Sequence, residues 1–189
     1  MLEEMHGYYA GERTSAFVVM GLGGASVVAG SLLVAQSSDF ERGLGVPLIA
    51  LGAIEGLGAI FYAFQVNGEI RHYATTLDRD GGSYRREELG HLRGTTSRFV
   101  FYRLTELGLA LAGAAMATYG FVANADAWKG AGIGVASIAL PFLIIDTINN
   151  ARAGSYDAAV RRFDPAENNV VSPLARANSP LYLSWSGRF

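Results

Sequence analysis

Four charged side chains stand inside otherwise apolar stretches of this 189-residue chain: Glu55, Arg103, Glu106 and Asp146. A charge in a hydrocarbon environment is costly unless it is paired or reached by water, so each of the four is a candidate for function. Two carboxylates around one arginine leave an excess negative charge. That arrangement suits a proton, a cation or a cationic substrate, and the chemistry it implies is the binding of positive charge.

The spacing of these residues also permits a purely structural cluster. Arg103 and Glu106 lie one helical turn apart on the same face and can pair directly. Glu55 can reach Arg103 across a helix interface, next to the small Gly52. We therefore predict an ion pair from Arg103 to Glu106 or Glu55. A buried Glu–Arg–Glu cluster of this kind can fix helix register without any ligand, with Asp146 placed at the lipid headgroups.

The charged residues belong to apolar segments that are each near the ~20 residues a helix needs to cross a ~30 Å hydrocarbon core. The segments are 16–35, 43–64, 99–122 and 130–148. The first has no polar face of the kind expected in a soluble bundle. Only 17% of residues are charged, fewer than in typical soluble domains. We predict an all-α, polytopic membrane protein with four transmembrane helices, arranged as two tandem helical hairpins in the lipid bilayer.

The distribution of basic residues predicts the orientation of these helices. Segment 65–98 holds six arginines and the C-terminal tail holds five, whereas each hairpin loop holds one basic residue. The positive-inside rule puts both termini and the central segment in the cytoplasm, with Ser38 and Asn124 outside. Lys129 is the only lysine among fifteen basic residues, which is typical of a high-GC genome. The expected location is the bacterial inner membrane.

The two halves of the chain share short motifs. Segment 14–18 reads Thr-Ser-Ala-Phe-Val and segment 96–100 reads Thr-Ser-Arg-Phe-Val. The pattern Asp-x-x-(Arg/Lys)-Gly-x-Gly-(Val/Ile) begins at Asp39 and again at Asp126. These matches predict parallel repeats about an axis along the membrane normal. The predicted hairpin repeats are 14–78 and 96–164, within one transmembrane domain of residues 1–164. The alternative is that membrane helices resemble one another through shared composition.

Small residues recur at helical spacing in the first two segments. Since lipid provides no hydrophobic drive between helices, close backbone contact through small residues supplies the packing. The stripe of the first segment is Gly21, Ala25 and Ala29, and that of the second is Gly45, Gly52, Gly56, Ala59 and Ala63. Such stripes serve packing within one chain, a homo-oligomer interface or contact with another membrane protein.

The polar segments are less informative. Segment 68–77 can continue the second helix into the cytoplasm, and 78–82 predicts a strong break. Segment 83–93 is typical of a solvated or membrane-surface helix. The three histidines are isolated, without ligand spacing, and are expected on the surface. Residues 165–189 form a polar tail with a short terminal aromatic segment, for which a short strand, an interfacial anchor and a partner-binding peptide are alternatives.

These observations narrow the function. The chain has no cysteine, no phosphate-binding loop and a net charge of −2, so we expect no catalytic residues, no metal, no cofactor and no nucleic-acid partner. The prediction is a non-enzymatic membrane subunit or scaffold, in an oligomer or a larger membrane complex. The alternative is a small transporter or channel that uses Glu55, Arg103 and Glu106. A sealed helical interior would favour the subunit, and a wet cavity touching Glu55 would favour the transporter.

Overall fold

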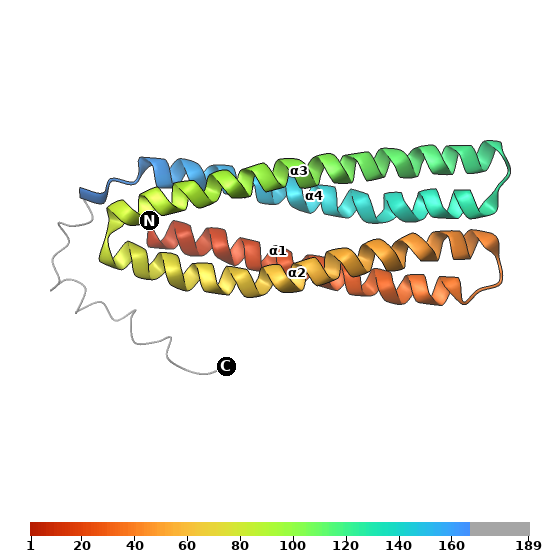
Figure 1. Ribbon diagram of the computed structural model, residues 1–189, viewed down its shortest axis with the longest axis horizontal. Helices are drawn as coiled ribbons and strands as arrows, with labels where there is room; N and C mark the ends of the chain where they lie inside the picture. The colour runs from red at the N-terminus through yellow and green to blue at the C-terminus, as the bar shows by residue number, and fades with distance from the viewer. Residues whose placement is uncertain (167–189) are drawn as a thin grey trace.

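The computed structural model describes residues 1–166, and within them four long helices form two side-by-side hairpins (Figure 1). The helices are α1 (Leu2–Val34), α2 (Asp39–Arg79), α3 (Gly81–Val122) and α4 (Asp126–Arg162). α1 packs along α2, α3 packs along α4, and α2 and α4 join the two hairpins. The structure therefore confirms the all-α fold with two hairpins. The predicted terminal aromatic segment lies outside the described residues.

The bundle has two distinct ends (Figure 1). One, here called the loop end, carries both hairpin loops. The other, the terminal end, carries the N-terminus, the α2–α3 turn and the end of α4. The break predicted over 78–82 narrows to one extended residue, Asp80, whose carboxylate accepts a 2.8 Å hydrogen bond from the Gly82 N–H. This bond caps α3, so the turn needs no longer loop.

All four helices are long and apolar enough to cross a membrane, which indicates an integral membrane protein. Large apolar side chains such as Phe61 and Phe64, 76% and 75% exposed, cover the outside of the predicted spans. The helices have 33 to 42 residues, so each continues past its span at the terminal end. At 1.5 Å per residue these extensions project about 20 Å or more beyond the hydrocarbon.

Two expectations about the extensions are tested by this geometry. Segment 68–77 continues α2, as predicted. Segment 83–93 is not a separate solvated or surface helix, because it forms the first turns of α3 without a break. Its Glu88 and Leu92 are buried, at 0% and 1% exposure, against the other helices. The acids and arginines predicted a solvated helix, but only Arg86, Glu87 and Arg93 are exposed, whereas Glu88 faces the interior.

The main hydrophobic core lies in the extensions and not in the spans. Its members are Met5, Tyr8, Tyr9, Val66, Tyr73, Leu77, Tyr84, Leu92, Phe99, Ala153, Tyr156 and Val160. Phe99 stands at the first position of its predicted span, and the others lie outside the spans. Burial of large apolar side chains is driven by water, so it organises the part of the bundle beyond the lipid. The terminal end is thus a four-helix bundle continuous with the membrane helices.

Glycines hold each hairpin together inside the spans. A Cβ at Gly30 would lie 2.6 Å from the Gly45 carbonyl oxygen and 2.9 Å from Leu48 and Ile49 side-chain atoms. A Cβ at Gly23 would lie 2.6 Å from the Gly52 carbonyl oxygen. Only glycine allows backbones to approach this closely.

The predicted small-residue stripe of α2 is buried along its whole length, so that prediction is confirmed. The stripe of α1 does not pack within the chain, because Gly21, Ala25 and Ala29 are all exposed. Its use as an interface with a second helix stays a prediction. The packing positions are instead Gly23 and Gly30. α1 is apolar around its circumference in this region, so small residues occur on more than one face.

The two hairpins use equivalent glycine contacts. A Cβ at Gly113 of α3 would meet Gly132, Val135 and Ala136 of α4. The partners of Gly30 are Gly45, Leu48 and Ile49 of α2. Adding 87 to these residue numbers gives 132, 135 and 136, which are the partners of Gly113 in α4.

The same offset relates the contacts between the hairpins at the loop end. Gly43 packs on the Ala127 carbonyl and Gly130 packs on the Phe40 carbonyl. The offset of 87 residues exchanges these two contacts, as a two-fold axis between the hairpins would. Superposition of 14–78 on 96–164 remains a prediction.

Candidate functional site

A cavity of about 340 Å³ lies between the hairpins and is lined by residues of all four helices. It is the place where three of the four predicted intramembrane charges meet: Glu55 of α2, Glu106 of α3 and Asp146 of α4. Apolar residues, among them Val19 and Leu109, make up most of the remaining wall. The sequence correctly marked these carboxyls as unusual, but their convergence on one cavity requires the packing of both hairpins.

The three carboxyls lack a matching set of positive charges. Within residues 1–166, no ion pair involves Glu55, Glu106 or Asp146. Glu106 is 7% exposed, and its Oε2 atom is buried without a hydrogen-bond partner. Glu106 and Asp146 lie close enough to interact electrostatically with each other. Mutual repulsion of such carboxylates in a low-dielectric site favours the uptake of a cation or a proton.

The ion pair predicted from Arg103 to Glu106 or Glu55 does not form in the described part of the chain. Arg103 does not line the cavity, and its Nε atom is buried without a hydrogen-bond partner. Its guanidinium interacts electrostatically with Asp146 instead. The prediction failed because α3 packs along α4, which brings Asp146 and not Glu55 near Arg103.

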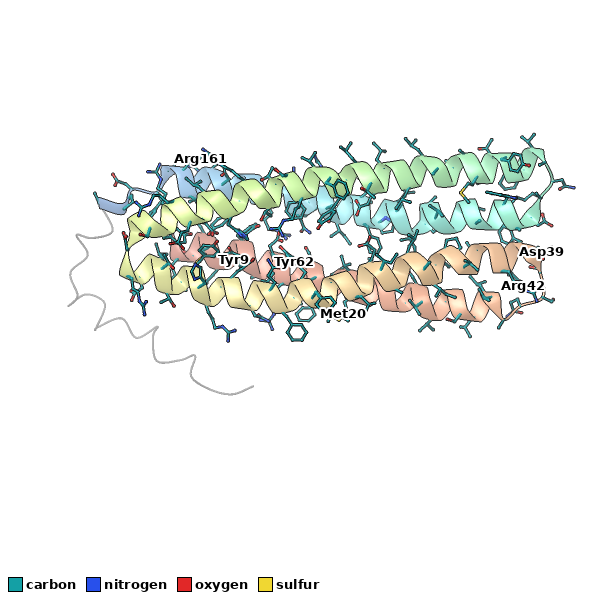
Figure 2. The ribbon with its side chains drawn as sticks, in the orientation of Figure 1. Tyr9, Met20, Asp39, Arg42, Tyr62 and Arg161 are labelled. Atoms are coloured by element: carbon teal, nitrogen blue, oxygen red, sulfur yellow. The ribbon has the colours of Figure 1, made fainter. Side chains whose placement is uncertain are left out.

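Polar residues form the cavity wall toward the terminal end. The Ser15 hydroxyl donates a 2.7 Å hydrogen bond to Asn149 Oδ1, and Arg152 Nη1 donates to the same oxygen at 3.2 Å. The Tyr62 hydroxyl, which also lines the cavity, donates to Glu12 of α1. Asp146 therefore lies beside a buried polar network. Figure 2 shows Tyr62 and Tyr9 in the terminal-end half, far from Asp39 and Arg42.

Sequence reasoning missed Glu12, which is fully buried. The signal that identifies it is a heptad-like spacing of buried positions along α1. Counted every three, four or seven residues, these positions are Met5, Tyr9, Glu12, Ala16, Gly23 and Gly30. An acid at such a position faces the bundle interior, because positions at this spacing share one helix face.

A second polar connection leads from the cavity to the extension of α3. Thr95 lines the cavity, accepts a 3.1 Å hydrogen bond from Arg98 and lies 3.4 Å from His91 Nε2. His91 Nε2 in turn lies 3.8 Å from the Glu69 carboxylate. The expectation that His91 is a surface residue is wrong, since its side chain is only 16% exposed. Burial lowers the pKa of His91.

A cluster of tyrosines surrounds a further carboxyl in the extensions, beyond the membrane spans. Tyr9 donates to Glu88 Oε1, while Glu88 Oε2 is buried without a hydrogen-bond partner. The hydroxyls of Tyr84 and Tyr156 are 2.7 Å apart in the same cluster. Burial raises the pKa of Glu88 to about 7, against the lowering effect of its hydrogen bonds with Tyr156, Tyr9 and Tyr73.

The chemistry available at the cavity is therefore binding of positive charge. Glu55, Glu106 and Asp146 line a largely apolar cavity, in which Arg98 is the one basic residue among the lining residues. In the part of the chain that the structure describes, no group of three or more His, Cys, Asp or Glu side chains has the arrangement to hold a metal ion. Comparison with protein-family models, curated proteins and solved structures finds no match to this chain.

Proposed function

We propose that this protein is a small membrane transporter that binds an organic cation in the cavity between its hairpins. The observation that supports this proposal most strongly is the cavity wall formed by Glu55, Glu106 and Asp146, with Glu106 buried and one of its oxygens unpartnered. A buried carboxylate oxygen without a hydrogen-bond partner is unfavourable, and an entering cation removes that penalty. The apolar wall favours an organic cation over a strongly hydrated inorganic ion.

The orientation that accompanies this proposal follows from the arginine distribution. The terminal end, with both termini and the α2–α3 turn, faces the cytoplasm, and the loop end faces outward. The cavity then lies in the cytoplasmic half of the membrane, and the proposed membrane is the bacterial inner membrane. Thr95 and His91 would connect the cavity to the cytoplasmic extension.

Binding of a series of quaternary ammonium ions to the protein in nanodiscs of zwitterionic lipid tests this function. We expect saturable binding of at least one member, weakened at least tenfold by Glu106→Gln, since the substitution keeps the shape and removes the charge. Asp39→Asn, at an exposed loop-end acid, is the matched control and should leave binding unchanged. Binding that Glu106→Gln does not alter, or no saturable binding in the series, would contradict the proposal.

A non-enzymatic subunit or scaffold is the second candidate, and one observation favours it. Gly21, Ala25 and Ala29 form a small-residue stripe on the exposed face of α1, where a second helix can approach closely. The partner would be a second copy or another membrane protein. Replacement of Ala25 by Leu should then dissociate the oligomer or complex in mild detergent, as measured by light scattering. If the unmodified protein is a monomer, and if the Ala25→Leu variant keeps the same partners in native membranes, this candidate is contradicted.

A further inference from the structure

The cavity wall between α2 and α3 is open to the outside of the bundle. Ile54 of α2 and Tyr102 of α3 both line the cavity, and as whole residues they are 66% and 45% exposed. A side chain that touches both the cavity and the outside marks the rim of an opening. α2 packs mainly against α1 and α4, which leaves this side of the wall without a tight helix contact.

Gly58 widens the same opening. It lines the cavity one turn from Ile54, it is exposed, and a Cβ placed on it would meet nothing within 4 Å. The buried glycines of the spans behave differently, because a Cβ on Gly23 or Gly30 would collide with backbone. Helix packing therefore does not require glycine at position 58, where the absent side chain leaves space at the rim.

The opening faces hydrocarbon and not water. Ile54 and Gly58 lie within the predicted span 43–64, and Tyr102 lies within 99–122. At 1.5 Å per residue, Gly58 is about 9 Å and Tyr102 about 5 Å inside the terminal-end boundary of these spans. A molecule that passes through the opening comes from the acyl-chain region of one leaflet.

The cavity behind this lipid-facing opening is acidic. Glu55, Glu106 and Asp146 line it, and the aromatic ring of Phe99 and the side chain of Leu109 add apolar surface. Charge complementarity selects a positive head group, and the lipid-facing opening selects a molecule that is already dissolved in the bilayer. A phosphate-bearing head group fits poorly because three carboxyls would repel it.

We propose that the substrate is an amphiphilic cation that enters from the bilayer through the opening between α2 and α3. Its positive head lies against the carboxyls of Glu55, Glu106 and Asp146, and its apolar tail remains in the lipid between Ile54 and Tyr102. This inference rests on the proposed function and adds the substrate class and the route of entry.

Two probes that share a head group separate entry from the lipid and entry from water: dodecyltrimethylammonium and tetramethylammonium. Binding to the full-length protein in nanodiscs is measured for both, with Glu106→Gln as the background that corrects for partitioning into lipid. We expect the dodecyl compound to bind at least tenfold more tightly after this correction. Equal corrected affinities would overturn the lateral route.

The decisive variant is Gly58→Leu, which fills the rim. It should weaken corrected dodecyltrimethylammonium binding at least tenfold and tetramethylammonium binding less than threefold. Gly108→Leu on α3 is the matched control, since Gly108 is also exposed and open around its Cβ but does not line the cavity. Gly58→Ala, which adds one methyl group to open space, should give a smaller effect in the same direction.

The outcomes are distinguishable. If neither probe shows binding that depends on Glu106, the proposed function itself fails. If both probes bind with that dependence and Gly58→Leu affects them equally or not at all, cation binding stands and the lateral entry of an amphiphile is overturned. The thermal midpoint of each variant, expected within about 3 °C of the unmodified protein, establishes that the comparison is made between folded proteins.

Discussion

Tyr9 of α1 donates a 3.0 Å hydrogen bond to Glu88 of α3, across 79 residues of sequence. Both side chains are buried, and within residues 1–166 the backbones of α1 and α3 do not pack against each other. The bond thus joins the two hairpins through side chains that cross the interior of the extension. Glu88 keeps its second carboxyl oxygen buried and without a hydrogen-bond partner.

Tyr9→Phe should destabilise the protein by about 1–3 kcal/mol, because it removes a donor from a buried carboxyl and leaves that group less satisfied. Chemical unfolding in a mild detergent, followed by circular dichroism, measures the change. Tyr119→Phe is the control, since Tyr119 is exposed near the loop end and should tolerate the loss of its hydroxyl. Equal stability of the two variants would show that the Tyr9–Glu88 bond contributes little.

Glu88 should make stability depend on pH. Burial raises the pKa of Glu88 from 4.5 to about 7 in the folded protein, so folding favours the protonated form. The unfolded chain then releases this proton at lower pH than the folded chain. Stability therefore falls as pH rises from about 4.5 to about 7 and shows no further loss from this group above that range.

Glu88→Gln should remove that penalty. The variant should gain up to about 3 kcal/mol over the unmodified protein at pH 8 and much less at pH 5. Glu69 and His91, the neighbouring titratable groups, are present in both proteins, so the difference between their thermal midpoints isolates Glu88. A difference that is constant between pH 5 and pH 8 would contradict this assignment.

Gly30→Ala should lower the stability of the first hairpin by roughly 1–3 kcal/mol, because the added methyl group meets the Gly45 backbone and two side chains. Gly113→Ala should have a similar effect on the second hairpin, at the equivalent contact with Gly132. Gly24→Ala is the control, since its Cβ would meet nothing within 4 Å. Thermal unfolding in one detergent ranks the three variants, and a loss at Gly24 as large as that at Gly30 would contradict the packing argument.

Arg103→Leu should raise cation affinity by roughly tenfold, because it removes the positive charge that interacts with Asp146. Arg103 does not line the cavity, so the substitution leaves the cavity wall intact. Affinity for dodecyltrimethylammonium in nanodiscs measures this effect. An affinity that falls in Arg103→Leu would mean that the arginine organises the carboxyls and does not compete with the cation.

Cysteine labelling tests the proposed orientation, since the chain contains no cysteine of its own. Ser37→Cys and Ala123→Cys, at the loop end, should react with an impermeant maleimide added outside intact cells. Arg79→Cys, at the terminal end, should react only after the membrane is opened. Ser38 is avoided because it caps α2, and Asn124 because its φ of 52° disfavours other side chains. Labelling of Arg79→Cys from outside would reverse the topology.

The sequence determined the number and pairing of the membrane helices. An apolar run of about 20 residues is a local property, and short loops such as 35–38 force neighbouring helices to run antiparallel. The sequence also identified Glu55, Glu106 and Asp146 as candidates, because a charged side chain in an apolar segment is unfavourable wherever the segment packs. The repeated loop motif at Asp39 and Asp126 likewise pointed to positions that meet in equivalent contacts.

Only the tertiary structure decided how each helix is rotated about its axis. In lipid, an apolar helix has no polar, water-exposed face to fix that rotation. Whether α1 packs through the Gly21 face or the Gly23 face therefore depends on its contacts with α2. The same rotation turns Glu106 toward the cavity and brings Arg103 near Asp146 and not Glu55. Buried Glu12 and Glu88 lie in the extensions beyond the predicted spans, and their partners Tyr62 and Tyr9 come from other helices. A carboxyl there is buried by packing that no single segment encodes.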